Sequence, residues 1–137
     1  MKQLQIKANI TGTGNYLPKN ILTNKDIEKL VDTSDEWIQS RTGIRERRIA
    51  RPGEASAELS THAINNLMDN YTLKADEIDA IIVATITPDM MFPATATIVQ
   101  KNINAKNAWG YDLSAACSGF LFALQSGAAL ISSGQCT

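Results

Sequence analysis

The segment Asp79-Ala80-Ile81-Ile82-Val83-Ala84-Thr85 most constrains the fold of this chain. Its apolar residues follow one another without the polar alternation that is typical of a strand with one face in water. This pattern therefore predicts a central strand of a parallel sheet that is covered on both faces. Because strand-like and helix-like segments alternate along the rest of the chain, we expect an α/β layered fold.

The remaining elements follow from periodicity and capping residues. We expect further strands at residues 4–10 and 108–113, and an extended, exposed segment at residues 45–53. Either Thr23 or Asn24 is suited to cap the first helix, while Ser34 precedes the second helix and Gly43 ends it. The expected helices span residues 25–31, 35–42, 56–70, 94–102 and 118–132. The last of these is apolar nearly all round, which predicts a place in the middle of a domain.

Composition excludes several classes of function. The chain has 137 residues, 44% of them apolar and 20% charged, which is typical of a globular domain. A net charge of −1 gives no overall attraction to nucleic acid or to an anionic membrane. The chain contains no apolar run of about 18 residues and no secretory signal at its start. Its two cysteines and one histidine match no metal-site spacing. We expect a cytoplasmic protein without a metal.

Cys117 lies where the strand at 108–113 runs into the helix at 118–132. A helix N-terminus favours the thiolate form of cysteine, which is a far stronger nucleophile than the thiol. The neighbouring residues are small, so a substrate carbonyl has room to approach the sulfur. Covalent acyl chemistry is one interpretation of this position. Burial as a small hydrophobic residue is the other, and it is common for free cysteines.

The residues around Cys117 resemble a known family. The segment Asp112-Leu113-Ser114-Ala115-Ala116-Cys117-Ser118-Gly119-Phe120 is similar to the nucleophile segment of β-ketoacyl-[acyl carrier protein] synthase III. That enzyme has the thiolase fold and starts bacterial fatty acid synthesis. The resemblance extends over residues 7–134. Its other blocks, in order, are Gly12-Thr13-Gly14-Asn15-Tyr16-Leu17-Pro18, Thr33-Ser34-Asp35-Glu36-Trp37-Ile38 with Arg41-Thr42-Gly43-Ile44-Arg45-Glu46-Arg47, and Thr87-Pro88-Asp89-Met90-Met91-Phe92-Pro93.

The resemblance implies a thiolase-like layered fold, with helices packed on a mixed β-sheet. Members of the family are more than twice as long and consist of two similar halves. We therefore expect residues 1–137 to form a truncated N-terminal half-domain whose C-terminal partner half is absent from this sequence.

By the same resemblance, Cys117 is the catalytic residue. It takes an acyl group from acetyl-coenzyme A, or a related short primer, and the acyl-enzyme then condenses with malonyl-[acyl carrier protein]. No permanently bound cofactor is implied. The family's catalytic histidine and asparagine lie outside this sequence. We expect His62, on the helix at 56–70, to be a surface or packing residue rather than their substitute.

Thr33, Trp37 and Arg41 are the cofactor-binding residues that the resemblance implies, with Trp37 stacked on the adenine of coenzyme A. Arg41 lies one helical turn beyond Trp37, and a guanidinium group suits phosphate. An anchor in the core is the alternative for Trp37. The run of arginines from Arg41 to Arg51 is typical of a solvated surface, and it also suits coenzyme A phosphates or an acidic carrier protein.

Phe92 lies in a loop between Pro88 and Pro93. In the resembled family this phenylalanine crosses the interface of a homodimer and closes the partner's acyl pocket, whereas local packing is the alternative. Cys136 has no motif around it and is expected to be an ordinary thiol.

Two competing functions remain. One is a related thiolase-fold enzyme, either a hydroxymethylglutaryl-coenzyme A synthase or a priming enzyme of polyketide or alkylquinolone synthesis. The other is a non-catalytic partner subunit.

Overall fold

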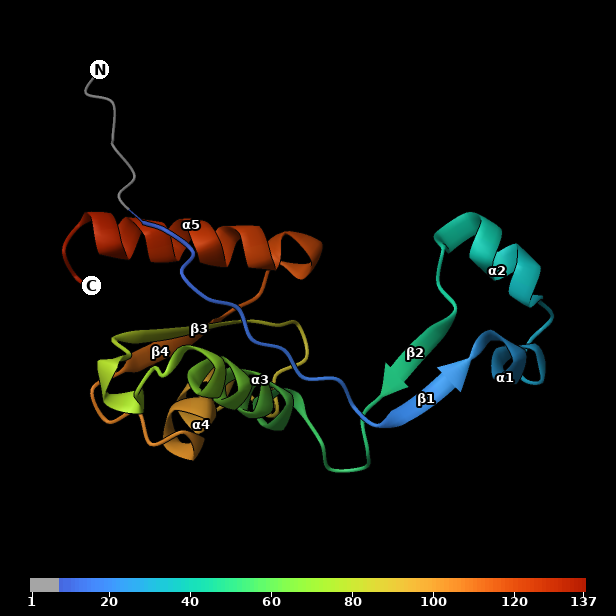
Figure 1. The fold of residues 1–137 in the computed structure, drawn as a ribbon, viewed down its shortest axis with the longest axis horizontal. Helices are drawn as coiled ribbons and strands as arrows, with labels where there is room; N and C mark the ends of the chain where they lie inside the picture. The colour runs from blue at the N-terminus through green and yellow to red at the C-terminus, as the bar shows by residue number, and fades with distance from the viewer. Residues whose placement is uncertain (1–7) are drawn as a thin grey trace, which may run out of the picture. The chain divides into compact units, whose positions relative to one another are not determined.

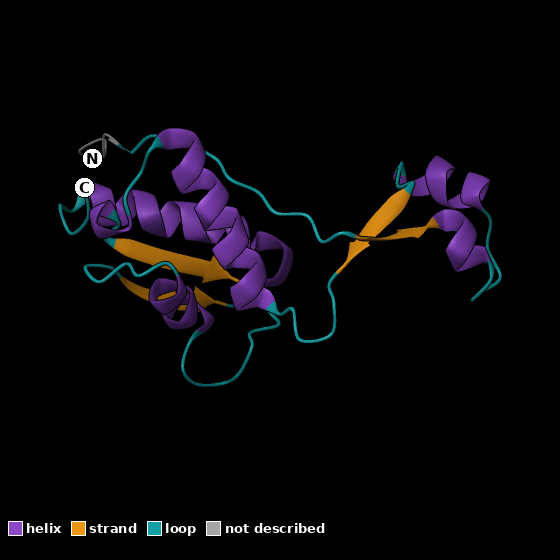
Figure 2. Cartoon of the chain, turned by 60° about the horizontal axis from the view of Figure 1, so that its bottom comes forward, coloured by secondary structure: helices purple, strands orange, loops and turns teal. Residues whose placement is uncertain are grey.

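The computed structural model describes residues 8–137, which form two compact units. One unit comprises Ala55–Thr137 together with residues 8–16, and we call it the sheet unit. The other comprises Leu17–Glu54, and we call it the hairpin unit. Each unit contains one pair of strands, drawn in orange in Figure 2.

The sheet unit is built on two parallel strands, β3 (Ala80–Ala84) and β4 (Trp109–Leu113). Helix α4 (Thr95–Asn102) lies between them in the chain, as a parallel crossover requires. Helix α3 (Ser56–Tyr71) packs beside α4 on one face of the strands, and α5 (Gly119–Ser132) lies on the other face (Figure 1). The predicted strand with cover on both faces is confirmed. These elements begin and end within one residue of the predicted positions.

Two single turns of 3₁₀-helix complete the sheet unit. The first, η1 (Ala75–Glu77), precedes β3, and the second, η2 (Ala116–Ser118), joins β4 to α5. Of the strand expected at residues 4–10, residues 4–7 lie outside the described part of the chain. Residues 8–10 have no regular secondary structure, so the prediction is wrong for them.

The core of the sheet unit lies between the strands and the helices α3 and α4. Its buried members are Ala57, Ile81, Ala96, Val99, Ile103, Ala105 and Ala108. Gly110 allows the close packing of this core, because a Cβ atom at that position would lie 2.5 Å from the backbone oxygen of Ile81. A side chain on Gly110 would therefore force β4 away from β3.

The prediction that α5 is buried is wrong for the described chain. Phe120 and Leu121 are each 65% exposed, and Phe122 is 50% exposed. The reason is that α5 packs with one face on β3 and β4, while most of its other apolar side chains meet no second layer among the described residues.

The hairpin unit pairs β1 (Asn20–Thr23) with β2 (Glu46–Ile49) in antiparallel register, with Thr23 opposite Glu46. Strand β2 falls within the segment predicted to be extended, whereas β1 was not predicted. The helices α1 (Asn24–Glu28) and α2 (Asp35–Thr42) lie between the two strands in the chain. Helix α1 thus starts one residue before its predicted start and ends three residues before its predicted end.

The capping predictions for the hairpin unit are confirmed. Thr23 caps α1 in a capping box with Asp26. The Ser34 hydroxyl accepts a hydrogen bond from the Trp37 N–H at 3.1 Å, and Gly43 ends α2 with a left-handed φ of 72°. Local residues therefore fix both ends of α2.

Candidate active site

Cys117 lies in η2, between the end of β4 and the start of α5. Its side chain is exposed and forms no disulfide bond. Burial as a small core residue is therefore not its role in the described chain. The residue lies just before α5 rather than in the first turn of the helix, since α5 begins at Gly119.

Ala116, immediately before Cys117, has a left-handed φ of 45°. This conformation is uncommon for a residue with a Cβ atom, and it costs about 1–3 kcal/mol unless the surrounding structure supports it. Such residues cluster at functional sites, where the strained turn aims a neighbouring side chain. The sequence gives no signal for this feature, because alanine carries no preference for the left-handed region.

The strand before Cys117 is tied to the core by Asp112. Its carboxylate oxygens accept hydrogen bonds from the backbone N–H groups of Thr95 and Ala96, at 2.7 and 2.8 Å. These two residues start α4, whose own cap residue, Ala94, offers no side-chain hydrogen bond. A carboxylate is favourable at this position because it meets both unpaired N–H groups and the positive end of the helix dipole.

The helix after Cys117 is held against β3. Gly119 is buried, and a Cβ atom there would lie 3.4 Å from the Cβ of Ala84. The Thr85 N–H donates to the Leu113 oxygen at 3.2 Å, just beyond the paired strands. Packed elements thus fix the chain on both sides of the Cys117 turn, while the thiol itself stays exposed.

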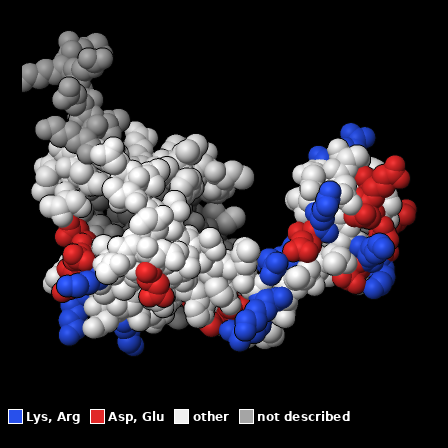
Figure 3. All heavy atoms as spheres, in the orientation of Figure 1, with Lys and Arg blue, Asp and Glu red and all other residues white. Residues whose placement is uncertain are grey.

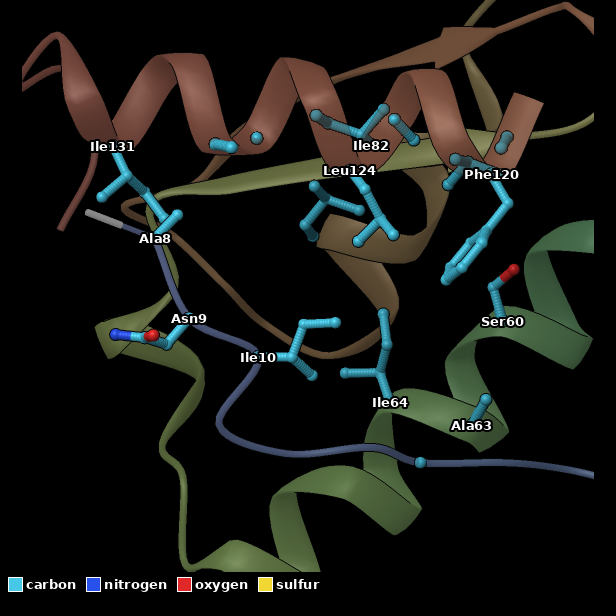
Figure 4. Close-up of a pocket in the computed structure, with 17 residues that line it drawn as sticks. Ala8, Asn9, Ile10, Ser60, Ala63, Ile64, Ile82, Phe120, Leu124 and Ile131 are labelled. Atoms are coloured by element: carbon cyan, nitrogen blue, oxygen red, sulfur yellow. The ribbon is translucent and has the colours of Figure 1, made fainter. Parts of the chain in front are cut away.

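An apolar cavity of about 860 Å³ lies between α5, β3 and α3 (Figure 4). Phe120 and Leu124 of α5 line it together with Ile82 of β3 and Ile64 of α3. Cys117 is not among its lining residues. The cavity can take apolar groups, but the thiol does not open into it.

The loop that carries Phe92 is anchored at its base and exposed at its tip. Asp89 accepts a hydrogen bond from the Ala57 N–H at 2.8 Å, and the Ser56 hydroxyl donates to the Thr87 oxygen at 2.7 Å. At the tip, Met91 is 97% exposed and Phe92 is 88% exposed. Local packing of Phe92, the alternative left open by the sequence, is excluded for the described chain.

The residues expected to bind coenzyme A lie in the hairpin unit. Trp37 is 58% exposed, whereas Ile38 next to it is the buried residue of α2. Trp37 is therefore not a core anchor. Arg41 is also exposed and lies four residues along the same helix. Thr33 and Trp37 help to line a hollow of about 340 Å³.

The arginine run does not form a uniformly basic surface. Arg48 lies 3.2 Å from a carboxylate oxygen of Glu46, and Arg51 lies 3.5 Å from Glu54. Figure 3 shows acidic and basic side chains mixed over the hairpin unit. This arrangement agrees with the interpretation as a solvated surface.

His62 lies on the exposed side of α3, as expected. Its Nε2 is 3.7 Å from a Glu58 oxygen, and its ring centroid is 4.5 Å from that of Tyr16. Across residues 8–137 no group of three or more His, Cys, Asp or Glu side chains is arranged to hold a metal ion. Among the helices described, none is long and apolar enough to cross a membrane.

The structure places Cys117 and Phe92 in the sheet unit, and Thr33, Trp37 and Arg41 in the hairpin unit. Sequence reasoning missed the residues that support the Cys117 turn, above all Ala116 and Asp112. An aspartate within an otherwise apolar strand was the available signal for Asp112.

Comparisons with known proteins agree with this architecture. The chain is 56% identical over 132 residues to β-ketoacyl-[acyl-carrier-protein] synthase III of Chlorobaculum tepidum, covering 96% of this chain and 40% of that protein. The crystal structure of 3-oxoacyl-[acyl-carrier-protein] synthase III from Aquifex aeolicus matches with a TM-score of 0.85 and 52% identity, over 90% of this chain and 40% of that one.

A priming β-ketosynthase of the R1128 polyketide pathway matches with a TM-score of 0.85 and 37% identity, over 90% of this chain and 37% of that structure. No protein-family model matches the chain.

The fold is that of the thiolase-type condensing enzymes, in an α/β arrangement of helices on parallel strands. Within that class, the chain is similar over nearly its whole length to curated proteins named β-ketoacyl-[acyl-carrier-protein] synthase III and to solved structures of that enzyme. It spans about 40% of the length of the curated relative described above.

Proposed function

We propose that this chain is the N-terminal half of a β-ketoacyl-[acyl-carrier-protein] synthase III and carries the nucleophile Cys117. The supporting observation is the exposed thiol on a left-handed turn between β4 and α5. The whole protein condenses an acyl-coenzyme A primer, most simply acetyl-coenzyme A, with malonyl-[acyl carrier protein]. The product is a β-ketoacyl-[acyl carrier protein].

In the first step the Cys117 thiolate attacks the thioester carbonyl of the primer. The carbon–sulfur bond to coenzyme A breaks, coenzyme A leaves as a thiolate that takes up a proton, and the acyl group stays on Cys117. The backbone N–H of Cys117 is the donor that this chain offers to the oxyanion. In the second step malonyl-[acyl carrier protein] loses carbon dioxide, and its carbanion attacks the acyl group and releases the cysteine.

The second step needs groups that stabilise the enolate, and these lie outside this sequence. We assign them to the second half of the whole protein, as in the family that the chain resembles. The exposed apolar side chains of α5 support that assignment, because a second half would cover them.

The substrate contacts divide between two surfaces. On the exposed face of α2, Trp37 stacks on the adenine of coenzyme A and Arg41 binds phosphate, with Thr33 beside them. On the loop after β3, Phe92 reaches across a homodimer and closes the acyl pocket of the partner. No cofactor is permanently bound. The free thiols of Cys117 and Cys136 suit the reducing cytoplasm.

A priming ketosynthase of polyketide synthesis is the second candidate, and the similarity to the R1128 enzyme favours it. The two candidates share the acylation step and differ in primer and acceptor. Incubation of the whole protein with malonyl-[acyl carrier protein] and labelled acetyl-coenzyme A, and in parallel with a labelled longer acyl-coenzyme A, tests the proposal. Labelled β-ketoacyl product is expected. Transfer of label only from longer primers or only to another acceptor would contradict the fatty-acid assignment.

A further inference from the structure

Asn24 is a buried polar residue at the start of α1, and it is only 1% exposed. A buried amide is favourable only when its hydrogen-bonding groups find partners. In the hairpin unit the only other strongly buried polar side chain among described residues is that of Glu54. The hydrogen-bond partners of Asn24 therefore indicate which parts of the hairpin unit its side chain holds together.

The amide of Asn24 connects the two ends of α2. Its Nδ2 donates to Asp35 Oδ1 at 2.7 Å and to the Ile44 backbone oxygen at 2.8 Å. Asp35 is the first residue of α2, and Ile44 follows Gly43, which ends the helix. One side chain thus holds the first turn of α2 and the chain directly after its last turn.

Two further bonds join this arrangement to β2 and to the residue directly before it. The Asn24 side-chain oxygen accepts a hydrogen bond from the Arg47 guanidinium, and the Asn24 N–H donates to the Arg45 oxygen at 3.2 Å. Both amide hydrogens and the amide oxygen of Asn24 are therefore used, which is nearly all that an asparagine side chain offers.

Other contacts that fix the orientation of α2 are few, and one of them is the hydrogen bond that the Asp35 N–H donates to a Glu28 side-chain oxygen of α1 at 2.6 Å. Ile38 is its one buried residue, so apolar packing contributes a single side chain. Trp37 and Arg41, on the exposed face of α2, do not add to this packing. The Glu28 bond holds only the start of α2, whereas the polar bonds through Asn24 hold both ends of the helix and so restrain the direction in which that face points.

We propose that Asn24 is a positioning residue that holds α2 so that Trp37 and Arg41 meet the nucleotide of the acyl-coenzyme A. This inference rests on the proposed function. Asn24 is buried and does not itself touch the substrate. It acts through Asp35 and Ile44.

The test compares two acyl donors in the whole protein. One is acetyl-coenzyme A, and the other is S-acetyl-N-acetylcysteamine, a thioester without the nucleotide. Asn24→Asp keeps the size of the side chain but removes both N–H donors and puts a carboxylate opposite Asp35. We expect kcat/KM for acetyl-coenzyme A to fall about tenfold to a hundredfold, through KM, because the contact groups are misplaced. For the short thioester we expect no more than about a twofold change, because that donor lacks the nucleotide.

Asn20→Asp is the matched control, since Asn20 is an exposed asparagine in β1 of the same unit. This substitution should leave kcat/KM unchanged for both acyl donors. Asp35→Ala is the second variant, for the case that Asn24→Asp does not fold. It removes the hydrogen bond between Asn24 and the first turn of α2 but leaves the bond to Ile44. It should lower kcat/KM for acetyl-coenzyme A selectively, by a smaller factor than Asn24→Asp does.

Trp37→Ala separates this inference from the proposed function. If Trp37→Ala lowers the preference for acetyl-coenzyme A while the Asn24 and Asp35 variants do not, the positioning role is wrong and the nucleotide site stands. If none of these variants changes that preference, both the nucleotide site and the role of Asn24 are wrong. An equal loss with both donors in the Asn24 and Asp35 variants would also overturn the positioning role, since it indicates general damage to the fold.

Discussion

The carboxylate of Asp112 accepts a hydrogen bond from the backbone N–H of Thr95 at 2.7 Å, across the sheet unit from β4 to the start of α4. A second aspartate acts in the same way, since Asp89 accepts from the Ala57 N–H at the start of α3. Neither helix has a side-chain hydrogen bond from its own cap residue. Aspartates distant in sequence therefore cap both helices, and one of them lies in the strand that leads to Cys117.

Replacing Asp112 with alanine should destabilise this chain. The two backbone N–H groups at the start of α4 would lose a charged partner in a partly buried place, which costs about 1–3 kcal/mol. Urea unfolding measures the change. Asp69→Ala, on the exposed side of α3, is the control and should lie within about 0.5 kcal/mol of the parent chain. Equal effects of the two substitutions would show that Asp112 is not a structural cap.

Gly110→Ala should separate β4 from β3. The new Cβ atom would lie 2.5 Å from the Ile81 oxygen, and overpacking of this kind costs about 1–3 kcal/mol. Gly127→Ala on α5 is the contrasting variant, because a Cβ atom there meets nothing within 4 Å. In a helix it should be neutral or stabilising by up to about 1 kcal/mol. Thermal unfolding of both variants tests the prediction, and a harmless Gly110→Ala would contradict the close strand pairing.

Acid should loosen the start of α1. Hydrogen bonds from the Thr23 hydroxyl and then Lys29 lower the pKa of Asp26 to about 2. A lowered pKa in the folded state stabilises the fold at pH values above the unfolded pKa of about 3.9. This contribution is lost as the pH falls from about 4 towards 2.

Thr23→Ala removes the largest cause and should raise the pKa of Asp26 towards its ordinary value. An NMR titration of the Asp26 carboxyl carbon measures the shift. The pKa of Asp35 is also lowered, chiefly by the hydrogen bond from Asn24, and it should stay low in Thr23→Ala. An unchanged pKa of Asp26 in this variant would exclude the capping box as the cause.

Phe92→Ala should change the primer specificity of the whole protein but not the stability of this chain. Because Phe92 is 88% exposed, its loss should change the stability of this chain by no more than about 0.5 kcal/mol. In the whole protein the loss of bulk should relax the limit on primer length. We expect the use of a primer longer by two carbons to rise about tenfold relative to acetyl-coenzyme A. Met91→Ala, at a neighbour that is also highly exposed, should not shift this preference. A shift of the same size in Met91→Ala would contradict the specific role of Phe92 in closing the acyl pocket.

Much of this fold follows from local sequence. Ser34 and Gly43 mark the ends of α2, and the apolar run at residues 79–85 becomes β3 with helices on both faces. These features depend on residues that are close together in the chain, so periodicity and capping preferences are enough to predict them.

The missed features depend on contacts between distant residues. Strand β1 has only four residues and pairs with β2, more than twenty residues later, so its own pattern is too short to predict it. The capping role of Asp112 and the left-handed Ala116 likewise arise from tertiary packing. The prediction that α5 is buried was wrong because an all-round apolar helix indicates that its surface should be covered, but not which segment covers it.

The most direct test of the proposed function is to find which residue of the whole protein carries the acyl group. Incubation with acetyl-coenzyme A alone, followed by mass spectrometry of the peptides, should show one acetyl group on Cys117. The acetyl group should be absent in Cys117→Ser and retained in Cys136→Ser, the matched control at the other cysteine. Acetylation that persists in Cys117→Ser, or a Cys117 that stays unmodified in the parent protein, would contradict the assignment of the nucleophile.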